Sequence, residues 1–96
     1  MKRKEVKKVG DLLYHFLKAN GLERGYAEYR LKKAWGELLG IPVARRTSSL
    51  TIRNRKLFVT LHSSVMRQEL DMIKDTLVPR LNEAAGMDVI DELVLR

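Results

Sequence analysis

The pattern of apolar positions predicts two helices in the first 40 residues. Between residues 9 and 17 the apolar side chains recur every three or four positions, which places them on one stripe of a helix. They are Val9, Leu12, Leu13, Phe16 and Leu17. Gly21 ends this helix, because glycine readily takes the left-handed conformation at a helix C-terminus. The same periodicity predicts a second helix from about Arg24 to Leu39, which Gly40 and Pro42 end.

Alternation of apolar and polar residues predicts two strands after the second helix, at roughly 48–54 and 57–62. Residues 43–49 show no clear periodicity and could form an extended lead-in to the first strand. One face of the strands is apolar, with Leu50, Ile52, Leu57, Val59 and Leu61. The other face is half polar and half aromatic, and we expect it to be partly exposed. It carries Thr51, Arg53, Phe58, Thr60 and His62.

A third helical pattern follows Ser63-Ser64, which can cap its N-terminus. Its apolar positions are Val65, Met66, Leu70, Ile73 and Leu77. Pro79 interrupts the pattern, because proline lacks an N–H and its ring clashes with the preceding turn. We therefore expect two helices, or one kinked helix, with a break near Lys74–Thr76 and an end at Gly86. Residues 89–95, VIDELVL, are predicted to form the last strand.

This order of elements predicts an α+β fold of two layers, in which helices cover a three-stranded sheet and two helices come first. The last strand follows a helical crossover, so it can pair parallel to an earlier strand. The order matches a type II KH-like topology. The chain of 96 residues is long enough for one such domain, expected over residues 9–96. Residues 1–8, MKRKEVKK, are expected to form a basic, mobile arm.

The charge of the chain is uneven. Residues 1–62 hold 15 Lys/Arg and 5 Asp/Glu, a net of +10, whereas residues 63–96 hold 4 Lys/Arg and 7 Asp/Glu, a net of −3, which together give +7. This asymmetry favours a polyanionic partner, and nucleic acid is the obvious class. Surplus lysine that only aids solubility is the alternative.

Several cations are candidates for phosphate contact, which gives affinity without sequence choice. They are Lys2, Arg3, Lys4, Lys7, Lys8, Arg30, Lys33, Arg45, Arg46, Arg53, Arg55 and Lys56. The last three occupy a predicted hairpin tip, where cations can also deter strand-to-strand aggregation. Phe58 is a candidate for stacking on a base, because its strand face also carries Arg53. Trp35 lies on an apolar helix face, so core packing is its expected role.

Catalytic chemistry has little support in the sequence. His15 and His62 have no acid or nucleophile at a recognisable spacing, and there is no phosphate loop, metal-ligand pair or dinucleotide fingerprint. We therefore expect no enzyme activity, cofactor, metal or small-molecule substrate. The absence of cysteine fits a reducing cytoplasm, and no apolar run is long enough to span a membrane. A KH clamp is also not expected, because its Gly-x-x-Gly loop would fall at Ile73-Lys74-Asp75-Thr76, which has no glycine.

Short stretches spread along the chain resemble, in order, one known family. They are Trp35-Gly36-Glu37-Leu38-Leu39-Gly40, Val43-Ala44, Thr47, Leu57-Phe58-Val59-Thr60-Leu61, Ser63-Ser64-Val65-Met66-Arg67-Gln68-Glu69-Leu70, Leu81-Asn82, Gly86, Val89-Ile90 and Leu93-Val94-Leu95-Arg96. The pattern resembles the DciA-like family of bacterial proteins over about residues 9–96. The resemblance implies a non-enzymatic, KH-like protein that binds DNA and helps to load the replicative DNA helicase.

Longer relatives carry a further extension that is used in partner contact, whereas this sequence stops at Arg96, directly after the last expected strand. We therefore expect the chain to act through the folded domain and residues 1–8. Two other functions stay open. One is a protein–protein adaptor with incidental basic charge, which would use the acidic last third or an exposed strand edge. The other is an RNA-binding KH-like protein.

Overall fold

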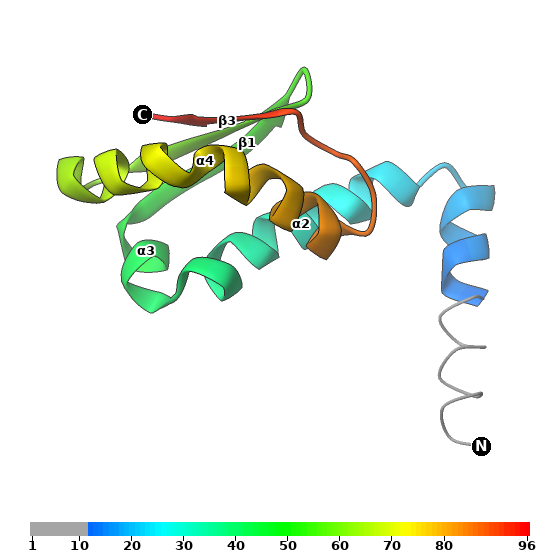
Figure 1. Ribbon diagram of the computed structural model, residues 1–96. Helices are drawn as coiled ribbons and strands as arrows, with labels where there is room; N and C mark the ends of the chain where they lie inside the picture. Colours follow the sequence, from blue (N-terminus) through cyan, green and yellow to red (C-terminus); the bar gives the residue numbers. More distant parts are fainter. Residues whose placement is uncertain (1–11) are drawn as a thin grey trace.

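Helices pack against one face of a three-stranded sheet in the computed structural model, which describes residues 12–96 (Figure 1). Residues 12–19 are helical. The elements that follow are α2 (Glu23–Leu39), α3 (Ile41–Arg46), β1 (Thr47–Arg53), β2 (Lys56–Leu61), α4 (Ser64–Ala85) and β3 (Glu92–Leu95). The α+β class, the three-stranded sheet and the two N-terminal helices are thus confirmed. The KH-like order is not.

The sheet has the order β1-β2-β3, with β1 and β2 antiparallel and β2 and β3 parallel. The parallel pairing expected for the last strand is therefore confirmed. β1 and β2 are joined by the two-residue turn Asn54-Arg55, whose φ angles of 50° and 61° are both positive. Such a turn matches the right-handed twist of the flanking strands, which is why two-residue hairpins favour it.

α4 is one helix of 22 residues that runs through Pro79, so the alternative of two helices separated near Lys74–Thr76 is wrong. Proline removes one backbone hydrogen bond, but the turns on either side bury Leu77 and Leu81 in the core, and this packing keeps the helix continuous. The residues that would form a KH clamp lie inside the helix. The ends of α4 are as expected, with Ser63 as the N-cap and Gly86, at φ 86°, as the C-cap.

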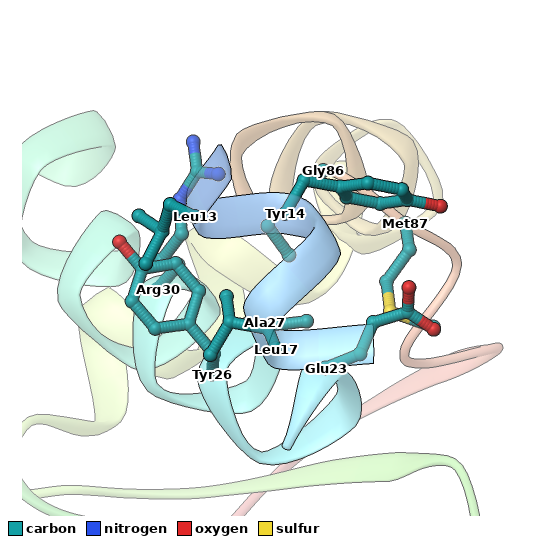
Figure 2. A pocket seen from close by; sticks show the side chains of 10 residues that line it. Leu13, Tyr14, Leu17, Glu23, Tyr26, Ala27, Arg30, Gly86 and Met87 are labelled. Carbon is teal, nitrogen blue, oxygen red and sulfur yellow. The ribbon is translucent and has the colours of Figure 1, made fainter. Parts of the chain in front are cut away.

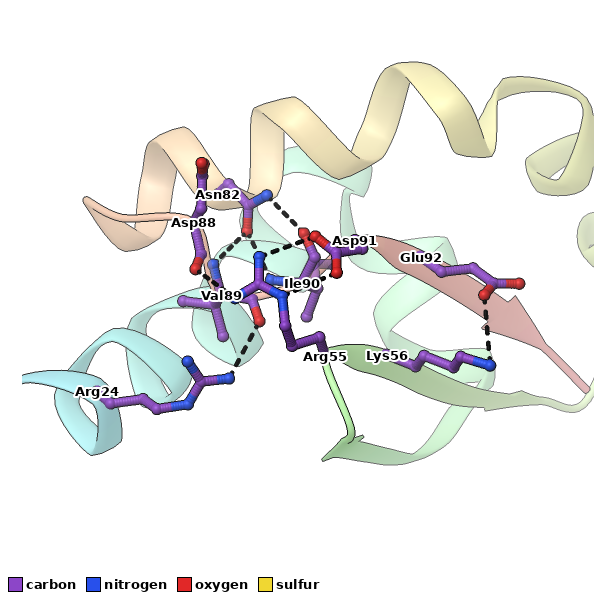
Figure 3. A network of polar contacts seen from close by, with 9 residues as sticks. All are labelled: Arg24, Arg55, Lys56, Asn82, Asp88, Val89, Ile90, Asp91 and Glu92. Atoms are coloured by element: carbon purple, nitrogen blue, oxygen red, sulfur yellow. Dashed lines mark hydrogen bonds and ion pairs between the residues drawn. The ribbon is translucent and has the colours of Figure 1, made fainter.

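β3 begins at Glu92 rather than at residue 89, which corrects the expected strand of residues 89–95. Val89 and Ile90 lie buried in the loop before β3. There the Asn82 side chain makes the backbone hydrogen bonds that a neighbouring strand would otherwise make (Figure 3). Asn82 Oδ1 accepts hydrogen bonds from the N–H groups of Val89 (2.9 Å) and Ile90 (3.0 Å), and Asn82 Nδ2 donates to the Ile90 carbonyl (2.8 Å). The buried backbone is therefore satisfied without strand pairing.

The segment after α2 forms the short helix α3, so the extended lead-in considered for residues 43–49 is wrong for its first four residues. Gly40, at φ 89°, turns the chain between the two helices. Pro42 lies in the first turn of α3, where its missing N–H has no helical partner to lose. α3 thereby brings Arg45 and Arg46 to the start of β1.

The core lies between α2, α4 and the inner face of the sheet. Trp35 is 1% exposed, as its apolar position predicts, and its Nε1 donates to Thr47 Oγ1 at 3.0 Å. α2 packs on α4 and α3, while α4 covers β2 and β3. Leu50 and Ile52 on β1 are consequently only half-buried, unlike Leu57 on β2.

The helix of residues 12–19 stands apart from the sheet, at the end of the molecule away from α3 (Figure 1). Leu12 is 68% exposed and Phe16 58%, so most of the predicted apolar stripe is in contact with solvent among the described residues. Val9, the first position of that stripe, lies outside them.

Candidate nucleic-acid interface

The outer face of the sheet is open to solvent and carries the polar and aromatic residues that strand alternation predicts. Core residues Leu57 and Val59 on β2 alternate with Phe58, whose cross-strand neighbours are Thr51 on β1 and Val94 on β3. Phe58 is half-buried, and Arg53 and His62 on the same face are exposed. The expected partial exposure of this face is confirmed.

Arg96 joins Phe58 on this outer face. The backbone of Arg96 is fixed to β2, because its N–H donates to the Val59 carbonyl and its carbonyl accepts from the Leu61 N–H, both at 2.9 Å. The guanidinium carbon of Arg96 lies 4.9 Å from the centre of the Phe58 ring. A guanidinium held over a ring in this way is attracted to it and still presents N–H donors at its edge. Such a pair can bind a phosphate oxygen or stack on a base.

Two of the three cations at the hairpin tip, Arg55 and Lys56, form ion pairs with acidic side chains (Figure 3). Arg55 binds Asp91 through two hydrogen bonds of 2.8 Å, from Nε to Oδ2 and from Nη2 to Oδ1, and also donates to the Asp88 carbonyl. Lys56 Nζ lies 3.6 Å from Glu92 Oε2. The hydrogen bond and charge of Arg55 hold the pKa of Asp91 below its ordinary value, and the pKa of Arg55 is raised in turn.

The backbone of Arg55 completes this connection, because its carbonyl accepts a hydrogen bond from the Asp91 N–H at 2.8 Å. The tip is thus attached to the loop before β3 through both side chain and main chain. Arg55 and Lys56 therefore have a structural role that the sequence analysis did not foresee. Arg53, by contrast, makes no ion pair with any of residues 12–96.

Further exposed cations lie along β1. Arg45 and Arg46 are exposed just before the strand begins, and Arg53 is exposed where it ends. The two ends of a seven-residue strand are roughly 20 Å apart. Lys33 lies with Lys32 in a groove beside the first half of β1. None of these side chains has a carboxylate partner within the part of the chain that the structure describes.

Arg30 lies elsewhere, in a pocket between residues 12–19, α2 and the end of α4 (Figure 2). Its guanidinium carbon is 6.0 Å from the centre of the Tyr26 ring, and the group lies next to Gly86, where a cation interacts favourably with the helix C-terminus. Among the cations that the sequence suggested for phosphate contact, Arg30 therefore lies apart from those along β1 and on the outer face. Lys2, Arg3, Lys4, Lys7 and Lys8 lie outside the described residues.

Two further types of site have no support in the described region. Residues 12–96 contain no group of three His, Asp or Glu side chains arranged to hold a metal ion. No helix among them is both long enough and apolar enough to cross a membrane.

Comparison with known proteins identifies the family. The family model described as "Dna[CI] antecedent, DciA" matches residues 8–95, which is nearly the whole chain. The chain belongs to the DciA family. A "UPF0232 protein" of Corynebacterium glutamicum is 27% identical over 85 residues, which cover 88% of this chain and 48% of that protein. The chain thus spans about half the length of the curated relative that it matches. No solved structure matches the chain.

Within this DciA domain, Arg96 and Lys32 are candidate contacts that sequence reasoning missed. Arg96 lies two positions after Val94, so strand alternation places both on the side of Phe58. Predicting that Arg96 lies near Phe58 requires knowing which residues of β2 and β3 are paired, and the sequence does not give this register. The sequence does not single out Lys32, because its position beside β1 depends on how α2 and α3 pack.

Proposed function

We propose that this chain is a non-enzymatic, DNA-binding accessory protein of DNA replication that assists or loads the replicative helicase. Membership of the DciA family, which is associated with helicase loading, supports the helicase part of this proposal. The outer face of the sheet supports the DNA part, and the two parts can be tested separately.

The observation that carries the DNA-binding proposal is the juxtaposition of Arg53, Phe58 and Arg96 on one exposed sheet face. An aromatic ring flanked by cations is a common way to hold a nucleic-acid strand, because bases stack on the ring and phosphates bind the cations. Binding then releases counterions from the DNA, so affinity depends on salt. Arg45, Arg46 and the cations of residues 1–8 would extend the contact along the backbone.

Charge reversal on the outer face tests this proposal. We expect the double substitution Arg53→Glu and Arg96→Glu to weaken binding of a fluorescent single- or double-stranded oligonucleotide by about tenfold or more at fixed salt. The matched control is Lys74→Glu with Arg80→Glu, which changes the net charge equally on the distant surface of α4.

The control should lose less than about threefold in affinity, because it removes the Lys74–Asp71 ion pair on α4 and changes only the long-range field at the outer face of the sheet. Equal losses in the two variants, or no loss in either, would contradict DNA contact through the outer face. The helicase part is tested by capture of purified replicative helicase on the immobilised chain, with the wild-type protein and both variants compared.

A further inference from the structure

The outer edge of β1 has backbone groups without a strand partner. β1 has a neighbour on one side only, and residues 48–53 make no backbone hydrogen bonds except those to β2 within the described region. The Val59 carbonyl points to β3, where it accepts from Arg96. Along antiparallel strands, residues that hydrogen-bond to the partner strand alternate with residues that do not. Leu50 pairs with Val59 and is of the second kind, as is Ile52. The N–H and C=O groups of both residues therefore point away from β2.

A groove of about 310 Å³ runs between this edge and α2. Residues 47–50 of β1 line it, together with Trp35 and Gly36 of α2 and Ala44 of α3. Lys32 and Lys33 line the helix side. Both lysines are exposed, and neither has a carboxylate within ion-pair distance among residues 12–96. The edge therefore combines strand-spaced donors and acceptors with two adjacent positive charges.

We propose that this edge binds an acidic polypeptide segment in the extended conformation, which adds to the sheet as a fourth strand beside β1. The free N–H and C=O groups of Leu50 and Ile52 supply main-chain hydrogen bonds at the spacing of a strand. Lys32 and Lys33 select acidic side chains that point toward α2. Leu50 is half-buried on the same α2-facing side of the sheet, so it accepts an apolar side chain two residues away from the acidic one in the added strand.

Two other occupants fit the edge less well. A DNA backbone presents acceptors only, so it would leave the outward carbonyls of Leu50 and Ile52 facing negative oxygens. A second copy of the chain, paired antiparallel through the same edge, would set Arg53 of one copy against the Arg45–Arg46 end of the other. Like charges in such positions oppose strand pairing.

The test uses two synthetic peptides of about ten residues, long enough to cover the strand. Glutamate and valine alternate along one face of the peptide strand, and threonine occupies the positions between them, so that an acidic and an apolar side chain both face α2. One has an ordinary backbone, and the other is N-methylated at alternate residues, which removes hydrogen-bond donors and keeps the charges. We expect the ordinary peptide to shift the amide resonances of residues 48–52 and to slow hydrogen exchange at Leu50 and Ile52. The methylated peptide should bind about tenfold more weakly or worse.

Variants of the chain test the charge selection. Lys32→Glu with Lys33→Glu should weaken binding of the ordinary peptide by about tenfold, while the control Lys74→Glu with Arg80→Glu should stay within about twofold of the wild type. Equal binding of the two peptides would overturn strand addition. So would resonance shifts away from β1, no binding at millimolar peptide, dimerisation through residues 48–52, or a stronger effect of an oligonucleotide on these same amides. The test does not involve Phe58 or Arg96, so its failure would leave the proposed DNA contact standing.

Discussion

Asn82 fixes the path of the chain between α4 and β3. It is a buried polar side chain, 8% exposed, and its amide group makes three hydrogen bonds to the backbone of Val89 and Ile90. Without the amide, two N–H groups and one carbonyl would be buried with no partner. A buried unsatisfied group costs more free energy than a hydrogen bond contributes, so this one residue has a large effect.

The first prediction is that Asn82→Ala lowers the free energy of unfolding by about 2–4 kcal/mol. Urea denaturation followed by circular dichroism measures the change. Asn20→Ala is the control, because Asn20 donates one hydrogen bond, to the exposed Phe16 carbonyl, and water can replace it. The control should change stability by no more than about 1 kcal/mol. Equal effects of the two substitutions would show that Asn82 does not hold the loop.

The second prediction concerns pH. Arg55 lowers the pKa of Asp91 in the folded state, so the pair stabilises the fold at pH values above the ordinary aspartate pKa of 3.8. This contribution is lost as the pH falls through the lowered value. We expect the melting temperature of the wild type to exceed that of Asp91→Asn between pH 5 and 7, and the difference to shrink below about pH 4. A difference that stays constant or grows toward pH 3 would contradict the pairing.

At the scale of elements, α4 shows how tertiary packing can outweigh a local signal. The sequence indicates an interruption because Pro79 cannot donate a backbone hydrogen bond and its ring crowds the preceding turn. Leu77 and Leu81, on either side of it, are nonetheless both buried in the same core. Pro79 itself is exposed, so its ring contributes little packing and its cost to the helix remains.

The third prediction follows from this cost. Pro79→Ala should raise the free energy of unfolding by about 1–2 kcal/mol, because the restored helical hydrogen bond outweighs the greater freedom of the unfolded chain. Arg80→Ala, at the next exposed position, is the control and should change stability by less than about 0.5 kcal/mol. A loss of stability in Pro79→Ala would mean that the proline shapes the end of α4.

Local sequence patterns were sufficient to predict the helices and strands whose apolar residues recur at helical spacing or alternate with polar ones. α2 and the hairpin strands lie within one or two residues of their expected positions, and Ser63 and Gly86 bound α4 as expected. The start of the last strand was not predicted correctly, because Val89 and Ile90 are as apolar as the residues of a buried strand. Only the contact with Asn82, seven residues earlier, shows that they form a buried loop.

The candidate site was harder to predict because it depends on which cations have partners. Arg53, Arg55 and Lys56 look alike in the sequence, yet Asp91 and Glu92 pair with two of them from 36 residues away. The outer sheet face containing Phe58 was predictable from alternation. Arg96 was not, because its position over the ring depends on the register of β3.

At the scale of the whole molecule, the net charge of +7 is distributed so that part of it stabilises the fold and part is left exposed. Arg55 and Lys56 connect the hairpin to the acidic end of the chain, and the Arg30 guanidinium carbon lies 6.0 Å from the centre of the Tyr26 ring. The cations left without acidic partners in residues 12–96 include those along β1 and on the outer face. Only a fraction of the total charge is therefore available for the proposed DNA contact.

The salt dependence of binding to a single-stranded oligonucleotide tests this assignment most directly. For the wild type, the logarithm of the affinity should fall linearly with the logarithm of the salt concentration. Neutralising Arg53→Gln and Arg96→Gln together should reduce the steepness of that line by about 1.4, since each phosphate contact on a single strand contributes about 0.7. A flat line for the wild type, or identical slopes for the two proteins, would contradict DNA contact through the outer face of the sheet.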